Sequence, residues 1–167
     1  MLIFDASTLI LLAKTELLEM FLDSFAGEVL IPVEVERECC SAKKSFDALL
    51  IEKAIKEERI AVKTLREKRL FRKIRDDFRL GKGEAEAIAL AFSAGAQLVG
   101  IDDKNGINAC KLLKLPFVTA INILIRMREK VFIEKDAALI RLDALERFGR
   151  YTSGIVADAR SRLEEER

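Results

Sequence analysis

The chain has 167 residues, about the length of one globular domain, and 50% of them are hydrophobic, which is enough for a sizeable core. It contains no histidine, which excludes Ser-His-Asp and Cys-His nucleophile pairs, histidine-ligated zinc and histidine acid–base catalysis. Its 29 basic and 28 acidic residues nearly cancel, so attraction to nucleic acid would have to come from local patches.

Short apolar runs alternate with longer helical patterns along the chain, an order typical of βαβ units and of an α/β fold with a parallel sheet. Strands are predicted at residues 2–4, 29–31, 60–62, 97–101 and 117–118. Helices are predicted at residues 8–25, 33–56, 65–80, 84–94 and 105–115, the second broken near Ser41, with two or three more after Thr119. Both prolines lie at element boundaries and no linker-like segment occurs, so one domain is expected.

The first candidate functional residue follows the first predicted strand. Asp5 ends the apolar run at residues 2–4 and stands two residues before Ser7. Parallel α/β sheets bind ligands beyond the carboxyl ends of their strands, so an acid at this place is a functional candidate. Asp5 can equally serve as the cap of the next helix, and for a single aspartate the two interpretations have similar weight.

A second acid lies in the helix that begins after Pro32. Glu38 stands three residues after Val35 and shares its expected core-facing side. Glu36 points away from that side, and Glu34 is only partly aligned with it. Glu38 is therefore the candidate that faces inward.

The helix predicted at residues 84–94 is apolar nearly all round, as a buried helix is, yet it begins with two glutamates. Glu84 and Glu86 face opposite ways, so only one of them is expected to point into a site. Acids in a first turn also interact favourably with the helix dipole, so ordinary end stabilisation is the alternative interpretation.

The fourth predicted strand is short, continuous and apolar, as a central parallel strand is, and it ends in Asp102-Asp103. The first and fourth strands are neighbours where the strand order of a doubly wound sheet reverses, so Asp5 and Asp102 are expected to lie together. Such carboxylates repel by roughly 4 kcal/mol per pair at about 4 Å and an effective dielectric of about 20, a penalty that a cation removes. Oxygen ligands without histidine or cysteine favour Mg²⁺ or Mn²⁺.

Taken together, these positions resemble the PIN-domain nucleases, which include the toxins of prokaryotic toxin–antitoxin pairs and enzymes of ribosomal RNA processing. The resemblance runs from Asp5 to about Ile133 and rests on four features of that family. Asp-x-Ser/Thr after the first strand is here Asp5 with Ser7, and the glutamate of a Pro-led helix is here Glu38. The acid five residues before an alanine is here Glu86 with Ala91, and the Asp that ends the fourth strand is here Asp102. The third acid is usually aspartate, and the family's threonine two residues before the fourth acid is Gly100 here.

The resemblance implies a three-layer α/β/α fold with a central parallel sheet of about five strands. It implies a single domain over residues 1–167, with a core of about 1–133 and a helical extension of about 134–167. It also implies a Mg²⁺- or Mn²⁺-dependent ribonuclease with RNA as its substrate and, for a toxin, an antitoxin protein as its partner. The residues implied as catalytic and metal-binding are Asp5, Glu38, Glu86 and Asp102, with Ser7, Glu84 and Asp103 as supporting residues or alternates.

The stretch at residues 63–82 holds nine Lys or Arg residues against three acids, directly before the acidic helix. We expect Phe71, Ile74 and Phe78 to anchor its apolar side, which leaves its cations available for phosphates. The predicted RNA-binding residues are Arg66, Arg69, Arg72, Lys73, Arg75 and Arg79. A merely solvated helix face is an equally good interpretation of this pattern.

Two other functions fit the same residues. One is a PIN-like module that binds RNA or a protein without cutting. This alternative stays open because Glu86 and Gly100 stand where the family usually has aspartate and threonine. The other is a Mg²⁺-dependent phosphohydrolase that uses Asp5 as its nucleophile. Haloacid-dehalogenase-like enzymes, however, carry a second Asp two residues after the first, where this chain has Ser7.

Location and assembly are predicted from the remaining patterns. No apolar run approaches the roughly 20 residues of a spanning helix and the start lacks a basic leader, so we expect a cytoplasmic protein without membrane association. Cys39, Cys40 and Cys110 are expected to be small buried hydrophobes rather than a disulfide or zinc framework. An apolar stripe after Ser153, together with the resemblance, predicts a homodimer.

Overall fold

The computed structural model describes residues 1–41 and 45–165. Its five strands form one parallel sheet in the order β3-β2-β1-β4-β5. The strands are β1 (Leu2–Phe4), β2 (Val29–Pro32), β3 (Ala61–Lys63), β4 (Leu98–Gly100) and β5 (Phe117–Val118). The chain moves outward from β1 to β3 and then returns to the other side of β1, so β1 and β4 are neighbours, as predicted.

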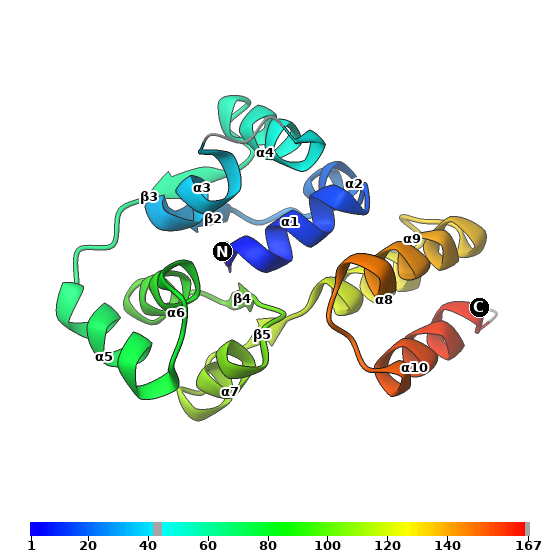
Figure 1. Ribbon diagram of the computed structural model, residues 1–167. Coiled ribbons are helices and arrows are strands. Elements are labelled where there is room, and N and C mark those ends of the chain that lie inside the picture. Colours follow the sequence, from blue (N-terminus) through cyan, green and yellow to red (C-terminus); the bar gives the residue numbers. More distant parts are fainter. Residues whose placement is uncertain (42–44, 166–167) are drawn as a thin grey trace.

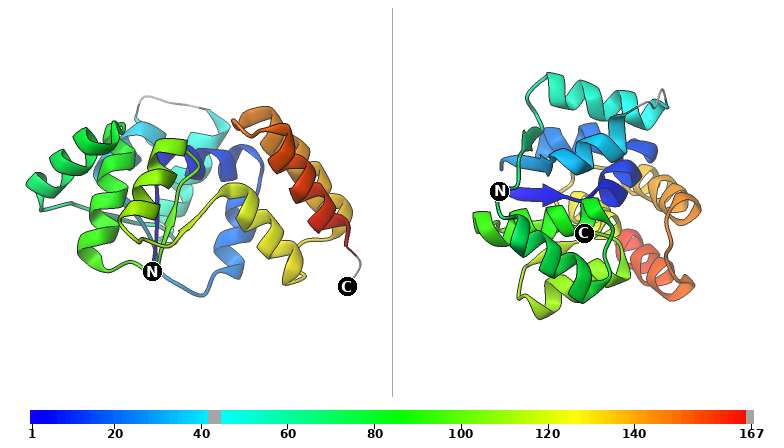
Figure 2. Two further views of the ribbon diagram at one scale, coloured as in Figure 1. Left: turned by 90° about the horizontal axis from the view of Figure 1, so that it is seen from below. Right: turned by 60° about the vertical axis from the view of Figure 1, so that its left-hand side comes forward.

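Helices cover both faces of this sheet and complete the predicted three-layer α/β/α fold (Figures 1 and 2). In the described part of the chain they are α1 (Ala6–Lys14), α2 (Leu18–Ser24), α3 (Val33–Cys40), α4 (Phe46–Lys56), α5 (Lys68–Phe78), α6 (Lys82–Ala94), α7 (Lys104–Leu112), α8 (Ala120–Glu129), α9 (Lys135–Phe148) and α10 (Ser153–Glu164). Figures 1 and 2 show α5 at one end of the molecule and α9 with α10 at the other.

Side chains that alternate along each strand enter two separate apolar clusters. Leu2 and Phe4 enter the cluster built with α1, α2, α8, α9 and α10, whereas Ile3 enters the cluster built with α5, α6 and α7. Val99 of β4 joins the second cluster. The period of two that defines a strand thus assigns each residue to one layer, and both faces of the sheet are buried, as in other parallel sheets.

The helix predicted at residues 8–25 is in fact two helices, α1 and α2. The Thr15 hydroxyl donates to the Leu11 carbonyl at 2.7 Å, and Glu16 takes a left-handed φ of 56° that ends α1. The turn places Leu17 and Leu18 in the core, where both are fully buried. Burial of these two leucines therefore outweighs continuation of the helix. The predicted break near Ser41 and three helices after Thr119 are both present.

Gly100 allows Phe4 to pack directly on β4. A Cβ atom at Gly100 would lie 2.1 Å from Cδ1 of Phe4. Phe4 is fully buried and is the residue of β1 that stands opposite Gly100 in the sheet. We expect Gly100→Ala to lower the free energy of unfolding by about 1–3 kcal/mol, because an overfilled core must shift. Urea unfolding measures this effect.

The matched control is Gly154→Ala, because a Cβ atom at Gly154 in α10 meets no other atom within 4 Å. This change is expected to leave stability equal or slightly higher, since alanine is favoured over glycine in a helix. Equal stability of the two variants would contradict the close packing of Phe4 on Gly100.

The last two helices belong to the same core as the sheet. Leu142 and Leu145 of α9 and Val156 and Leu163 of α10 are buried in the cluster that contains β1. Most of the apolar stripe from which a homodimer was predicted is therefore used inside the chain, and Ile155 alone among its large side chains is 50% exposed. The dimer itself stays a prediction.

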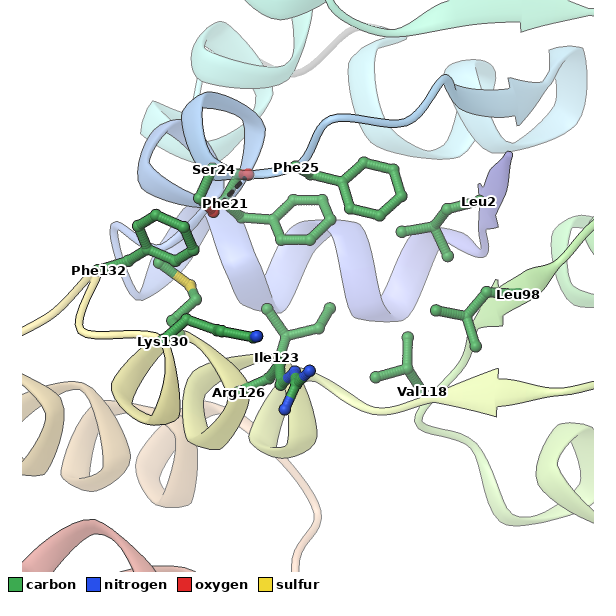
Figure 3. A pocket seen from close by; sticks show the side chains of 11 residues that line it. Leu2, Phe21, Ser24, Phe25, Leu98, Val118, Ile123, Arg126, Lys130 and Phe132 are labelled. Atoms are coloured by element: carbon green, nitrogen blue, oxygen red, sulfur yellow. Dashed lines mark hydrogen bonds between the residues drawn. The ribbon is translucent and has the colours of Figure 1, made fainter. Parts of the chain in front are cut away.

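An apolar pocket lies against the first residues of β1 and β4, between α2 and α8 (Figure 3). Its volume is about 430 Å³. Phe21 and Phe25 form one wall of the pocket. Arg126 and Lys130 belong to the opposite wall, and their side-chain nitrogen atoms lie beside the pocket. The helices thus leave part of this face of the sheet open, at the end away from the strands' carboxyl ends.

In the two described ranges no helix is long and apolar enough to cross a membrane. Cys39 and Cys110 are buried and Cys40 is half-buried. Burial raises the pKa of the Cys110 thiol to about 12, so it stays protonated at neutral pH. The expectation of small buried hydrophobes is therefore confirmed for Cys39 and Cys110, whereas Cys40 is only partly covered.

Candidate active site

Asp5 lies completely buried directly after β1, and its environment fixes the orientation of its carboxylate. The Thr8 N–H donates to Oδ1 at 2.8 Å and the Ser7 hydroxyl donates to Oδ2 at 2.7 Å. The Asp5 N–H donates to the Gly100 carbonyl at 3.0 Å, which ties the residue to the end of β4. Asp5 therefore caps α1, and the same hydrogen bonds hold a carboxylate at the edge of the sheet.

Burial raises the pKa of Asp5 to about 7, although hydrogen bonds from Ser7 and Thr8 oppose the rise and the charge of Asp102 adds to it. A buried carboxylate is costly to ionise unless a positive charge compensates it. No described lysine or arginine forms an ion pair with Asp5 or Asp102. The pair is thus a place where a cation would be stabilising.

Asp102 follows β4 and faces Asp5, while its neighbour Asp103 does not. The Ala120 N–H, at the start of α8, donates to Asp102 Oδ2 at 3.0 Å, and the Tyr151 hydroxyl donates to Oδ1. Burial raises the pKa of Asp102, and these two hydrogen bonds oppose the rise. Asp103 instead caps α7, accepting the N–H groups of the next turn at 2.7 and 3.1 Å.

The Thr8 hydroxyl is close enough to Asp5 and Asp102 to lower the pKa of both carboxyl groups. Its oxygen is buried and forms no hydrogen bond of normal geometry with any residue in the described ranges. A buried hydroxyl without a partner is destabilising, so such groups usually mark the place of a water molecule or an ion. Thr8 therefore supports a polar ligand between the two aspartates.

Glu38 of α3 reaches the start of α6 because residue 83 is glycine. Glu38 Oε1 accepts the Gly83 N–H at 3.0 Å, and a Cβ atom at Gly83 would lie 2.7 Å from that oxygen. Glu84 Oε2 accepts the Gly81 N–H at 3.0 Å and so satisfies the N–H of the residue that precedes α6. Burial raises the pKa of Glu84, and the charges of Asp103 and Glu38 raise it further.

Glu86 points away from Glu84 on α6, because residues two apart in a helix do not share a face. Its Oε2 atom accepts the Glu34 N–H at 2.9 Å, so it caps the first turn of α3 and lines a different pocket. The geometry therefore favours Glu84 over the predicted Glu86. The reason is the helical period, because residues two apart point in opposite directions and the packing of α3 on α6 decides which one faces Asp102.

A pocket of about 460 Å³ opens beside the acids. Its polar lining contains acids, hydroxyls and cations: Ser7, Glu84, Asp102, Asp103, Tyr151, Lys14, Lys104 and Arg150. No three carboxylates or thiols in the described part of the chain are already close enough to hold one ion. The site therefore consists of buried Asp5 and half-buried Asp102, with Glu84 and Glu38 nearby, each turned to an N–H group at the start of α6.

The donor set nevertheless fits a hard divalent cation in kind. All of its atoms are carboxylate or hydroxyl oxygens, which Mg²⁺ and Mn²⁺ prefer. These acids gather beyond the carboxyl ends of β1 and β4, at the point where the strand order reverses. A family model described as a PIN domain matches residues 1–166. The chain belongs to the PIN-domain family. No curated protein sequence matches it.

PIN domains are generally nucleases, and they typically depend on divalent metal ions. The fold predicted from the sequence is therefore confirmed for this PIN domain, as is its family. The roles of its individual acids, its preference for RNA and its partners stay predictions.

Tyr151 is a site residue that the sequence did not reveal. It lies between α9 and α10, 49 residues after the Asp102 that it contacts. Burial raises the pKa of Tyr151 far above its usual range and the charge of Asp102 adds to this, so the phenol remains a neutral donor. The one available signal was that Tyr151 is the chain's single tyrosine, in a short polar segment before the last helix.

The basic residues of this PIN domain divide into two groups. Arg72 and Arg75 line the pocket that also contains Glu86, together with Lys68 and Lys82, which the sequence did not single out. The other four predicted RNA-binding residues line neither that pocket nor the one beside the acids: Arg66, Arg69, Lys73 and Arg79. As predicted, Ile74 is buried and anchors α5 on the core.

The raised pKa of Asp5 predicts how stability of the metal-free protein depends on pH. The folded state keeps the proton to about pH 7, whereas the unfolded chain loses it near the ordinary pKa of 3.8. The unfolded state therefore binds fewer protons between these values, so the free energy of unfolding falls as pH rises through this window, by up to about 4 kcal/mol. Urea unfolding in EDTA at pH 5 and pH 8 measures the fall.

Asp5→Asn is the control for this pH dependence, because asparagine has no proton to lose. The free energy of unfolding of the variant, minus that of the natural protein, is expected to increase from pH 5 to pH 8, because only the natural protein loses stability when Asp5 ionises. A constant difference across that range would show that Asp5 ionises normally in the fold.

Proposed function

We propose that this PIN domain is an endoribonuclease that hydrolyses RNA phosphodiester bonds with Mg²⁺ or Mn²⁺. One observation carries the proposal: buried Asp5 and half-buried Asp102 lie at the ends of adjacent strands, close enough for the charge of Asp102 to raise the pKa of Asp5, and no described basic side chain forms an ion pair with either. Two such carboxylates repel each other and favour a cation between them. The orphaned Thr8 hydroxyl at the same place supports this.

Asp5 and Asp102 would hold the cation, and Glu84, which lines the same pocket as Asp102 and lies near Glu38, would orient the attacking water molecule. A bound divalent cation polarises the scissile phosphate and lowers the pKa of water. Ser7 and the Thr8 N–H keep the Asp5 carboxylate in one orientation, while Tyr151 and the Ala120 N–H do the same for Asp102. Such fixed ligands need little reorganisation during the reaction.

Glu84 is the best candidate for the general base. Its pKa is raised by burial, so it accepts a proton more readily than an ordinary glutamate near neutral pH. Its Oε2 atom is occupied by the Gly81 N–H, which leaves Oε1 for the proton. The cations Lys14, Lys104 and Arg150 at the same pocket would contact the phosphates on either side of the scissile bond.

The test uses a 5′-labelled single-stranded RNA incubated with Mn²⁺, with Mg²⁺ and with EDTA. Metal-dependent internal cleavage that disappears in Asp102→Asn is the expected result. Binding of the RNA without cleavage in either metal would overturn the proposal and support a binding module. Release of phosphate from a small phosphomonoester, with RNA left intact, would instead support the phosphohydrolase.

A further inference from the structure

A second polar pocket lies on the other side of α6 from the acids, between α6 and α5, which lie side by side (Figure 1). We call it the α5–α6 pocket; its volume is about 490 Å³. Four cations line it: Lys68, Arg72, Arg75 and Lys82. The first three lie three or four residues apart on one face of α5, and Lys82 begins α6.

Most of these cations are not neutralised within the protein. Lys68, Arg72 and Lys82 form no ion pair with any described residue, whereas Arg75 pairs with Asp76 at 2.9 Å. Like charges around one cavity repel each other, and an anion that enters it removes the repulsion. A phosphate is the anion that lysine and arginine recognise most often in this arrangement.

The same pocket has an aromatic wall and two carboxylates, of which Glu34 pairs with Arg37 at 2.9 Å and Glu86 forms no ion pair with any described residue. Phe71 is half-buried, and the Arg75 guanidinium lies 5.6 Å from its ring centre. Glu86 uses Oε2 for the Glu34 N–H, while its Oε1 has no hydrogen-bond partner in the described part of the chain. Flat apolar walls stack bases, and a carboxylate accepts the N–H groups of an amino-bearing base edge.

We propose that the α5–α6 pocket binds one nucleotide of the RNA strand near the scissile phosphate, and that it favours bases with an exocyclic amino group. Lys68, Arg72 and Lys82 contact the phosphate, Phe71 stacks on the base, and Glu86 accepts the amino group. Uracil is disfavoured because carbonyl oxygens flank its N–H on both sides and repel the carboxylate. The proposal rests on RNA as the substrate of the proposed function.

The position of the pocket fits a strand that passes over the start of α6. Glu84 faces the acids and Glu86 faces the α5–α6 pocket, so the width of one helix, about 10 Å, separates the two. A single stacked strand covers this distance with about three nucleotides, since stacked nucleotides rise by about 3.4 Å each. The nucleotide in the pocket is thus close to the bond that is cut.

Binding is measured by fluorescence anisotropy with labelled oligocytidylate and oligouridylate of equal length, in EDTA so that no cleavage occurs. The natural protein is expected to bind oligocytidylate at least fivefold more tightly than oligouridylate. Arg72→Ala combined with Lys82→Ala should weaken binding of both at least tenfold. Phe71→Leu keeps the apolar contact with the core but should weaken binding severalfold, and Glu86→Gln should remove the preference for cytosine.

The matched control for charge is Lys111→Ala, on the exposed surface of α7 outside both pockets. It should change affinity less than twofold. Equal losses from Lys111→Ala and from the combined Arg72→Ala and Lys82→Ala variant would show unspecific attraction and overturn the proposal. Equal affinity of the natural protein for the two oligonucleotides would overturn it as well. The binding assay needs no metal, so it tests the subsite separately from the nuclease function. Weaker RNA binding in the pocket variants, without any cleavage by the natural protein in Mn²⁺, would refute the nuclease function and support the subsite. Cleavage with an unchanged KM in the pocket variants would support the nuclease function and refute the subsite.

Discussion

Asp5→Asn is expected to reduce RNA cleavage by more than about a hundredfold, because even indirect partners of metal ligands cost up to this much when they are removed. Asparagine has nearly the same shape and keeps an oxygen for the Thr8 N–H. It lacks the negative charge, however, and replaces one ligand oxygen with an amide nitrogen. Single-turnover cleavage in Mn²⁺ measures the loss.

The same substitution separates a catalytic aspartate from a mere helix cap. If Asp5 served only as the cap of α1, asparagine would be a good replacement, because asparagine and aspartate are about equally favoured at that position. Activity close to that of the natural protein would therefore assign Asp5 to the cap alone. An inactive variant that unfolds at the same or a higher urea concentration in EDTA at pH 8 would assign it to the reaction.

Glu84→Gln is expected to lower the rate at saturating RNA by about 10²- to 10⁴-fold, the usual contribution of a general base. Glu86→Gln should act on the KM for RNA instead, since Glu86 points to the α5–α6 pocket. Initial rates over a range of RNA concentrations separate the two parameters. The two substitutions are chemically identical and stand two residues apart on one helix, so each is the control for the other.

The opposite pattern, a large loss of rate in Glu86→Gln and a small one in Glu84→Gln, would restore the residue that the sequence favoured. Unfolding curves must accompany both variants, because Glu84 and Glu86 each accept a helix-terminal N–H group. Glutamine keeps an acceptor oxygen at both positions, so the cost to stability is expected to be about 1 kcal/mol or less.

The sheet and its aspartate pair could be predicted because they depend on local patterns and on chain topology. Each strand is a short apolar run, and neighbouring parallel strands bring their carboxyl ends to one edge. Asp5 and Asp102 follow two such runs directly, so their meeting needs only the correct strand order. The prediction therefore holds for these residues even though 97 positions separate them.

The glutamates could not be assigned with the same certainty, because their directions depend on how helices pack. Glu84 lies in the first turn of α6 and Glu86 follows it by two residues, in a helix whose pattern is apolar nearly all round. Nothing in such a pattern tells which side faces α3. The contact of Glu86 with the Glu34 N–H, and of Glu38 with the Gly83 N–H, settles the matter only once both helices are in place.

Long-range contacts of loops were beyond reach for the same reason. Tyr151 meets Asp102 because α8 and α9 carry the chain away from the sheet and the segment before α10 brings it back. The basic residues on α5 were recognised, but Lys82 of α6 joins Lys68 and Arg72 only through the angle between the two helices. Sequence spacing fixes the faces of single helices and not the angles between them.

Through the phenol of Tyr151, the C-terminal part of the chain contributes directly to the candidate site. A fragment that stops at Ile133 would retain every acid discussed above, but Asp102 would lose one of its two hydrogen-bond donors and the core would lose the leucines of α9. Under the proposed function, a protease that cuts the chain between α9 and α10 is therefore expected to abolish RNA cleavage although every carboxylate remains in place. Limited digestion followed by the RNA cleavage assay measures this effect.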